Sequence, residues 1–102
     1  MKASSESLTH AAIYECNSEY RAVLHVHALM PWKNLLNHIP TTSGETEYGT
    51  IGMANEIARL MRETALHEFR AIAMAGHPGG LIAFGRNLGE AFDALMKILK
   101  SA

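Results

Sequence analysis

Two groups of histidines have the residue type and spacing of metal ligands. His25 and His27 are separated by a single residue, and His77 lies in the glycine-rich stretch Gly76-His77-Pro78-Gly79-Gly80. In a β-strand, residues i and i+2 project from the same face roughly 6–7 Å apart, so two imidazoles at this spacing can share one metal ion. Catalytic zinc favours three histidines with one open position, and a carboxylate can take the fourth place. The histidines therefore predict a divalent-metal site.

Each histidine also has a structural interpretation. A His-x-His pair at a strand end can hydrogen-bond to the backbone and to water, and a histidine in a turn can simply be solvated. Spacing alone does not select a carboxylate ligand, because the chain has ten acidic residues. His10 is interpreted as a structural hydrogen-bonding residue, and Cys16 as a small buried residue and not a nucleophile. From the residues alone, both interpretations of the histidines stay open.

Helices and strands must alternate along the chain to position these residues. The predicted elements are, in order, a helix over 5–16, a strand over 21–27, a short helix over 28–37, a loop over 38–49, a helix over 50–63, two strands over 70–75 and 80–84 joined by the glycine-rich turn, and a helix from residue 88. Apolar residues point to both sides of the strand over 21–27, which predicts that helices cover both faces of the sheet. The predicted fold class is therefore α/β (or α+β), a layered sheet with helices on its faces.

The last helix has the clearest sequence signal. Asn87 and Glu90 have the spacing of a capping box, which marks a helix N-terminus. The residues at helical spacing after it predict one buried apolar face: Leu88, Ala91, Phe92, Leu95, Ile98 and Leu99. Methionines, Met96 among them, are expected to fill gaps in the core, and Trp32 to shield one wall of the site or lie at the surface.

Composition limits the class of protein. A chain of 102 residues has room for one small domain, and 48% hydrophobic with 19% charged residues is ordinary for a globular protein. With a net charge of −1 and no stripe of Lys and Arg, neither nucleic acid nor a membrane surface is expected as a partner. The single cysteine, the polar N-terminal residues and the lack of a long apolar run predict a cytoplasmic protein without internal disulfides.

Several motifs, taken in order, resemble the class II aldolase/adducin family, which includes the fuculose-phosphate aldolases. They are Ser4-Ser5-Glu6, His10-Ala11-Ala12-Ile13-Tyr14, Ala22-Val23-Leu24-His25-Val26-His27, Tyr48-Gly49-Thr50, Gly76-His77 with the glycines that follow, and Leu88-Gly89-Glu90-Ala91-Phe92. The resemblance spans nearly the whole chain. It implies that residues 1–102 form one shortened domain of this family, with a layered sheet.

The resemblance also implies residue roles. His25, His27 and His77 would be the ligands of Zn²⁺ or another divalent metal, Glu6 the catalytic acidic residue, and Ser4 with Ser5 the binding site for a substrate phosphate. The implied activity is that of a lyase in carbohydrate metabolism, the aldol cleavage of a small phosphorylated ketose through a metal-stabilised enediolate. A homo-oligomer, in the family commonly a four-fold tetramer, is the implied assembly.

The departures from the family pattern leave alternatives. The family's segment before the serines has no counterpart here, so we expect an open sheet edge that another chain covers. The enzymes more often have an asparagine where Gly76 precedes His77, which could change how that histidine is oriented. A non-catalytic metal-binding or oligomerising remnant, comparable to the adducin head domain, and one half of a split enzyme are therefore the alternatives.

Overall fold

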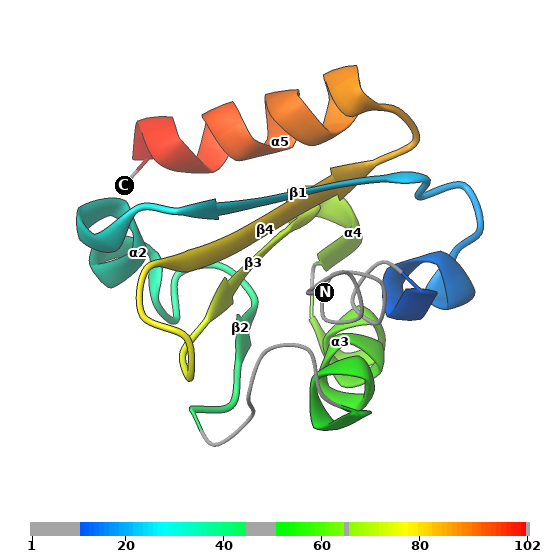
Figure 1. The fold of residues 1–102 in the computed structure, drawn as a ribbon, viewed down its shortest axis with the longest axis horizontal. Helices are drawn as coiled ribbons and strands as arrows, with labels where there is room; N and C mark the ends of the chain where they lie inside the picture. Colours follow the sequence, from blue (N-terminus) through cyan, green and yellow to red (C-terminus); the bar gives the residue numbers. More distant parts are fainter. Residues whose placement is uncertain (1–10, 45–50, 65, 102) are drawn as a thin grey trace, which may run out of the picture.

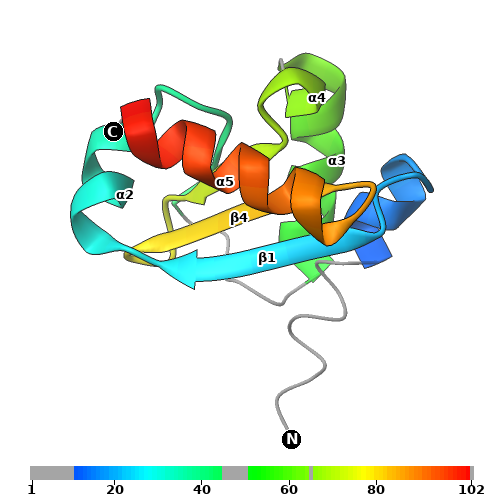
Figure 2. The same ribbon diagram turned by 90° about the horizontal axis from the view of Figure 1, so that it is seen from above.

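A four-stranded sheet lies between two layers of helices (Figure 1, Figure 2). The structure, a computed structural model, describes residues 11–44, 51–64 and 66–101. The predicted α/β class is confirmed, because helices and strands interleave along the chain and helices cover both faces of the sheet. Within these described ranges, no helix is both long enough and apolar enough to cross a membrane.

The sheet is mixed, with the order β1-β4-β3-β2. Its strands are β1 (Ala22–His27), β2 (Thr41–Thr42), β3 (Ala71–Met74) and β4 (Gly80–Gly85). β4 pairs with both β1 and β3 in antiparallel orientation, and β2 pairs with β3 in parallel. The predicted hairpin around the glycine-rich turn is confirmed as β3 and β4. The short strand β2 lies inside the segment that we predicted to be a loop.

The helices follow the predicted order. They are the helical residues 11–16, α2 (Leu29–Leu35), α3 (Ile51–Glu63), α4 (Leu66–Phe69) and α5 (Leu88–Ser101). α5 begins as predicted, because Asn87 Oδ1 accepts a hydrogen bond from the Glu90 N–H at 2.9 Å. α4 is a single turn that the sequence pattern does not predict.

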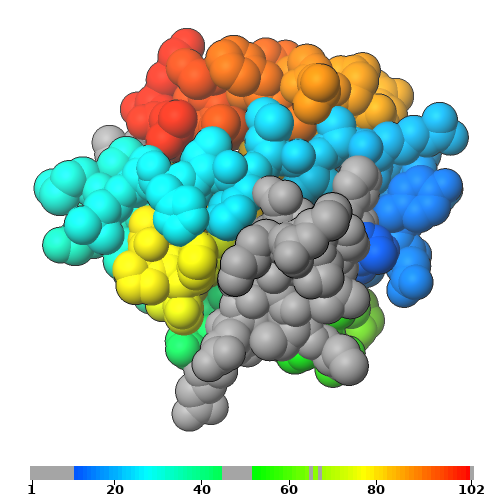
Figure 3. Space-filling model, viewed as in Figure 1, coloured from blue at the N-terminus to red at the C-terminus, as the bar shows by residue number. Residues whose placement is uncertain are grey.

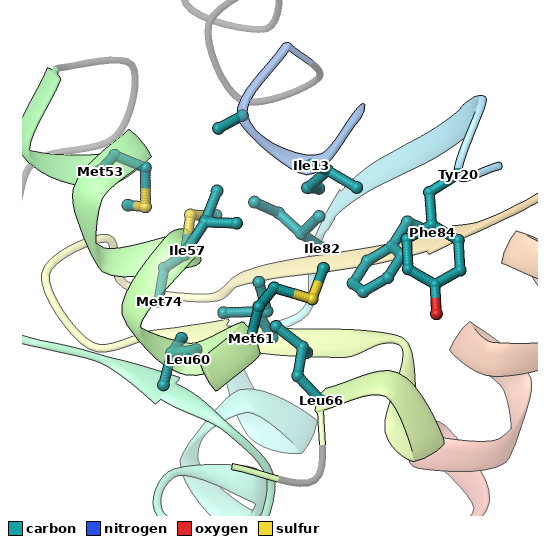
Figure 4. Close-up of a cluster of buried hydrophobic side chains, with 12 residues drawn as sticks. Ile13, Tyr20, Met53, Ile57, Leu60, Met61, Leu66, Met74, Ile82 and Phe84 are labelled. Carbon is teal, nitrogen blue, oxygen red and sulfur yellow. The ribbon is translucent and has the colours of Figure 1, made fainter. Parts of the chain in front are cut away.

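One hydrophobic core lies between the sheet and the helical residues 11–16, α3 and α4 (Figure 4). Ile82 and Phe84 of β4 point into it and are fully buried. The core also holds Ile72 and Met74 of β3 and four residues of α3: Met53, Ile57, Leu60 and Met61. Tyr20 closes one end, its ring 4.7 Å from that of Phe84.

A second core fills the other face of the sheet, under α5 and α2. Leu81 and Ala83, which alternate with the first-core residues of β4, are fully buried there. Leu24 and Val26 of β1 pack against this core, whereas Val23 packs against the first. The prediction that β1 is covered on both faces is therefore confirmed.

Three predictions of burial are wrong. Leu88 and Phe92 of α5 are 65% and 53% exposed, so the apolar face of that helix is wider than the surface it covers. Met96, expected in the core, is also exposed. Cys16, expected to be buried, lies exposed at the end of the helical residues 11–16.

Candidate metal centre

The register between β1 and β4 leaves a gap beside the His-x-His pair. His25 lies opposite Ile82, and His27 lies opposite Gly80. Because alternate residues of a strand share a face, both histidines are on the face of the sheet that carries the first core. The residue across from His27 has no side chain, so space remains there for a ring from elsewhere.

His77 comes from the turn between β3 and β4. Its N–H donates to the Met74 carbonyl at 3.1 Å, and its own carbonyl accepts from the Gly80 N–H at 2.8 Å. Gly79 has a φ of +80°, a conformation that residues with a side chain rarely adopt. The turn therefore depends on its glycines and brings the chain back directly into β4.

Gly80 provides the space that the His77 ring occupies. A Cβ atom at position 80 would lie 2.5 Å from Cδ2 of His77 and 2.9 Å from the His77 carbonyl oxygen. Both distances are well inside van der Waals contact, so only glycine allows the ring to lie against the start of β4. The sequence showed a flexible turn here, but not that Gly80 is the surface under the ring.

The three imidazole rings meet at this end of the sheet. One ring nitrogen from each of His25, His27 and His77 lies within 4.8 Å of the other two. Nε2 of His77 is 3.2 Å from Nε2 of His27, and the ring centroids of His25 and His77 are 5.5 Å apart. His27 is exposed, while His25 and His77 are partly buried. Solvent can therefore reach the cluster from one side.

The environment favours the neutral form of His77, which is the form that binds metals. Burial lowers the pKa of His77 below its ordinary value of 6.5, and the nearby His27 lowers the same pKa further. A neutral imidazole has a lone pair free for coordination. Protons therefore compete less with a metal cation for the His77 nitrogen.

These donors fit a divalent metal ion. Two nitrogens that each lie 2.0–2.1 Å from a tetrahedral zinc ion are about 3.3 Å apart, close to the separation of the His27 and His77 nitrogens. Three imidazoles with one solvent-facing side also match the donor set of catalytic zinc, in which one position stays open. The cluster could therefore hold a metal ion through three protein ligands.

Two contacts from α2 and the residue before it fix the turn that carries His77. The Ala28 N–H donates to the Gly79 carbonyl at 2.9 Å. The Trp32 Nε1–H donates to the Met74 carbonyl at 3.0 Å, the same oxygen that accepts the His77 N–H. Trp32, which we expected at the wall of the site or at the surface, is buried in the second core and holds the turn from behind.

The structure describes only some of the other residues that were candidates for the site. Ser4, Ser5 and Glu6 lie outside the described residues, and so does His10. His38 is exposed and lies after α2. The histidine triad is therefore the part of the predicted site that the structure describes.

Comparison with known families agrees with the fold. The model of the class II aldolase and adducin N-terminal domain matches residues 1–102. The chain belongs to the class II aldolase/adducin family. No curated protein and no solved structure matches it. As a class II aldolase-like domain, the chain has a mixed sheet with helices on both faces and a histidine cluster at one end of the sheet.

Proposed function

We propose that this class II aldolase-like domain is a divalent-metal-dependent lyase acting on a small phosphorylated ketose in the cytoplasm. The chain acts as one domain over residues 1–102 and assembles as a homo-oligomer. The metal is zinc or a similar divalent ion. One observation supports the proposal most directly. Ring nitrogens of His25, His27 and His77 lie within 4.8 Å of one another, although the strand and the turn that carry them are about fifty residues apart in sequence.

The three histidines, Glu6 and the two serines have distinct roles in this proposal. His25, His27 and His77 hold the ion, which when bound supplies a Lewis acid that polarises a ketose carbonyl. Glu6 moves a proton at the substrate carbon, and its assignment rests on the family resemblance. Ser4 and Ser5 bind the substrate phosphate through hydroxyl and amide groups on the same basis. His27, the exposed ligand, faces the side from which substrate enters.

Metal analysis of the untreated protein is the first test. We expect one divalent ion per chain, and we expect His27→Ala and His77→Ala each to lower metal content to near background. His38→Ala is the matched control, because it removes an exposed imidazole outside the cluster and should leave metal content unchanged. Equal metal content in all four proteins would contradict the assigned ligands.

Turnover separates the lyase from its alternatives. A panel of ketose phosphates, assayed with metal and after chelation, should show cleavage that chelation abolishes. Stoichiometric metal without turnover of any substrate would favour the non-catalytic metal-binding module. Activity that appears only after addition of a second polypeptide would favour the split enzyme.

A further inference from the structure

A basic hollow lies on the flank of α5 that faces away from β1. It measures about 370 Å³, a size that admits a small ligand. Its lining comes from α5 and from the residue that joins α4 to β3: Arg70, Asp93, Met96, Lys97 and Lys100. Figure 2 shows α5 between β1 on one side and α4 on the other, so the hollow lies on the α4 side. Three cationic groups and one carboxylate therefore line a single volume.

Arg70 holds a backbone conformation that an arginine rarely adopts. Its φ is 51°, in the left-handed region, at the point where the chain leaves α4 and enters β3. Its N–H donates to the Leu66 carbonyl at 2.7 Å, and its carbonyl accepts from the Phe84 N–H at 2.9 Å. Glycine or asparagine usually takes such a position after a helix. An arginine held there at a cost in backbone energy indicates that its side chain has a role in the hollow.

The guanidinium of Arg70 has more donors than its contact with α5 uses. Its Nη1–H donates to Glu90 Oε1 at 3.0 Å, which holds the group beside α5. Glu90 is also paired with Arg86, whose Nε–H donates to Oε2 at 2.9 Å. Two guanidinium groups therefore share one carboxylate, and this cluster keeps an excess positive charge. The other side-chain N–H groups of Arg70 make no hydrogen bond to the described residues, so they can donate to a ligand.

Lys97 and Lys100 bring two further positive charges to the same volume. They are three residues apart, so both side chains extend from one side of α5. A lysine in the last turn stabilises the helix dipole, which accounts for Lys100 but not for Arg70, a residue outside the helix. Among the described residues, neither lysine forms an ion pair. Their charges are therefore available to a ligand.

We propose that this hollow binds a phosphate or diphosphate group of a small ligand. The three cations exceed the one carboxylate, Asp93, by two charges, which a phosphate dianion neutralises and a single carboxylate group does not. The planar fork of Arg70 matches phosphate oxygens, and the two ammonium groups donate to the same anion from α5. Met96, which is 37% exposed, offers apolar surface to the rest of the ligand.

The hollow is separate from the metal centre. Arg70 precedes the first residue of β3 and His77 follows the last, so the two side chains belong to opposite ends of that strand. The histidines lie on the face of the first core, whereas α5 covers the second. In Figure 3 the turn between β3 and β4, in yellow, lies below β1, in cyan, and α5, in orange to red, lies above it. Anion binding in the hollow therefore requires neither the metal nor lyase activity.

Calorimetric titration of the full chain with inorganic pyrophosphate tests the site. Phenanthroline, an uncharged chelator, is present so that pyrophosphate cannot bind through a metal ion. We expect one pyrophosphate per chain, with a dissociation constant that rises about fivefold in Lys97→Gln and in Lys100→Gln. Lys33→Gln is the matched control, because it removes the same charge from an exposed residue of α2 outside the hollow. No binding, or equal affinity in all four proteins, would overturn the proposal.

Nitrogen–proton correlation NMR of the wild type locates the anion without relying on a weakened variant. We expect pyrophosphate to shift the Nε–H signal of Arg70 and the backbone N–H signals of Asp93 and Lys97. The Arg70 signal is assigned by its loss in Arg70→Lys, which keeps the charge but not the planar fork. Shifts confined to His27, His77 and the turn would place the anion at the metal centre and would overturn the proposal, whatever the lyase activity of the protein.

Discussion

Gly80 determines where the His77 ring lies, so a single methyl group at this position should disturb the metal centre. In Gly80→Ala the new Cβ would clash with His77 Cδ2, and the ring must rotate or the turn must shift. We expect metal affinity to fall by about tenfold or more, the range seen when groups that orient ligands are lost. Competition titration against a chromophoric chelator measures this. Gly44→Ala is the control, since its Cβ would meet only Ala75 Cβ at 4.0 Å. Unchanged affinity in Gly80→Ala would refute the role of Gly80.

Glu90 should give the protein a specific sensitivity to acid. Its carboxylate bonds the Arg86 side chain and backbone N–H and the Arg70 guanidinium. Chiefly through Arg86, these contacts lower the pKa of Glu90 to about 2 from an ordinary value of 4.5. Between these two values the unfolded chain binds a proton that the folded chain does not, so the contribution of Glu90 to stability is lost as the pH falls.

The variant Glu90→Gln isolates this contribution. Compared with the wild type, it should be less stable above about pH 4.5, and the difference should vanish towards about pH 2. Urea unfolding at a series of pH values measures the two free energies. A difference that stayed constant across the acid range would show that Glu90 acts through its shape and not through its charge.

Sequence patterns predicted some properties of single residues and could not predict others. The spacing of His25 and His27 correctly placed both on one face of a strand, because strand geometry is local. The exposure of Leu88 and Phe92 could not be predicted from helical periodicity, because it depends on how far the sheet extends beneath α5. The hydrogen bond of Trp32 to Met74 joins residues 42 positions apart, and no local pattern indicates it.

At the scale of elements, α2 supports the turn between β3 and β4 from behind. Trp32→Phe keeps the buried ring but removes the N–H that reaches the Met74 carbonyl. We expect a loss of about 0.5–1.5 kcal/mol in the free energy of unfolding. We also expect metal affinity to fall by about tenfold, because the turn loses one of its anchors. Chemical denaturation and metal titration measure the two effects separately.

Ile98→Val distinguishes the two effects of Trp32→Phe. Ile98 lies in the same core as Trp32 but on α5, whereas Trp32 and Ala28 make the hydrogen bonds to the turn. The substitution costs about 0.5–1.5 kcal/mol. This control should lose stability and keep its metal affinity. If both variants lost affinity equally, general destabilisation would explain the result, and Trp32 would have no positioning role.

The elements themselves were largely predictable. Helices with a strong periodic face, such as α3 and α5, and the alternating strand β1 were placed within a few residues of their observed ends. Two short elements were missed for a physical reason. β2 exists because Thr41 and Thr42 pair with β3, and α4 is one turn whose Leu66 enters the first core. Both depend on tertiary contacts and have little local signal.

In the molecule as a whole, the two hydrophobic cores share one sheet, so we expect both cores to unfold together. Leu81 and Ile82 are adjacent, fully buried residues of β4 that point into opposite cores. Leu81→Ala and Ile82→Ala should each cost about 2–5 kcal/mol, and unfolding should remain one transition. Fluorescence of Trp32, in the second core, and far-ultraviolet circular dichroism should report the same midpoint. Separate midpoints in either variant would show that the layers fold independently.

The overall arrangement was predictable only in part. Interleaved helices and strands gave the fold class, and the glycine-rich turn predicted the β3–β4 hairpin. The strand order could not be derived, because pairing β1 with β4 requires contact between segments more than fifty residues apart. The meeting of His77 with His25 and His27 follows from that pairing. At the sequence level it therefore rested on family resemblance and not on spacing.

The exposed thiol of Cys16 has a practical consequence. It is the only cysteine of the chain, so a nitroxide or fluorophore can be attached at one defined position without mutagenesis. Partial burial, and then the neighbouring Glu15, raise the pKa of this thiol, so labelling should proceed faster in mildly alkaline buffer than at neutral pH. In any symmetric assembly, nitroxide labels would report a single set of spin–spin distances. These distances would measure the spacing of the subunits directly.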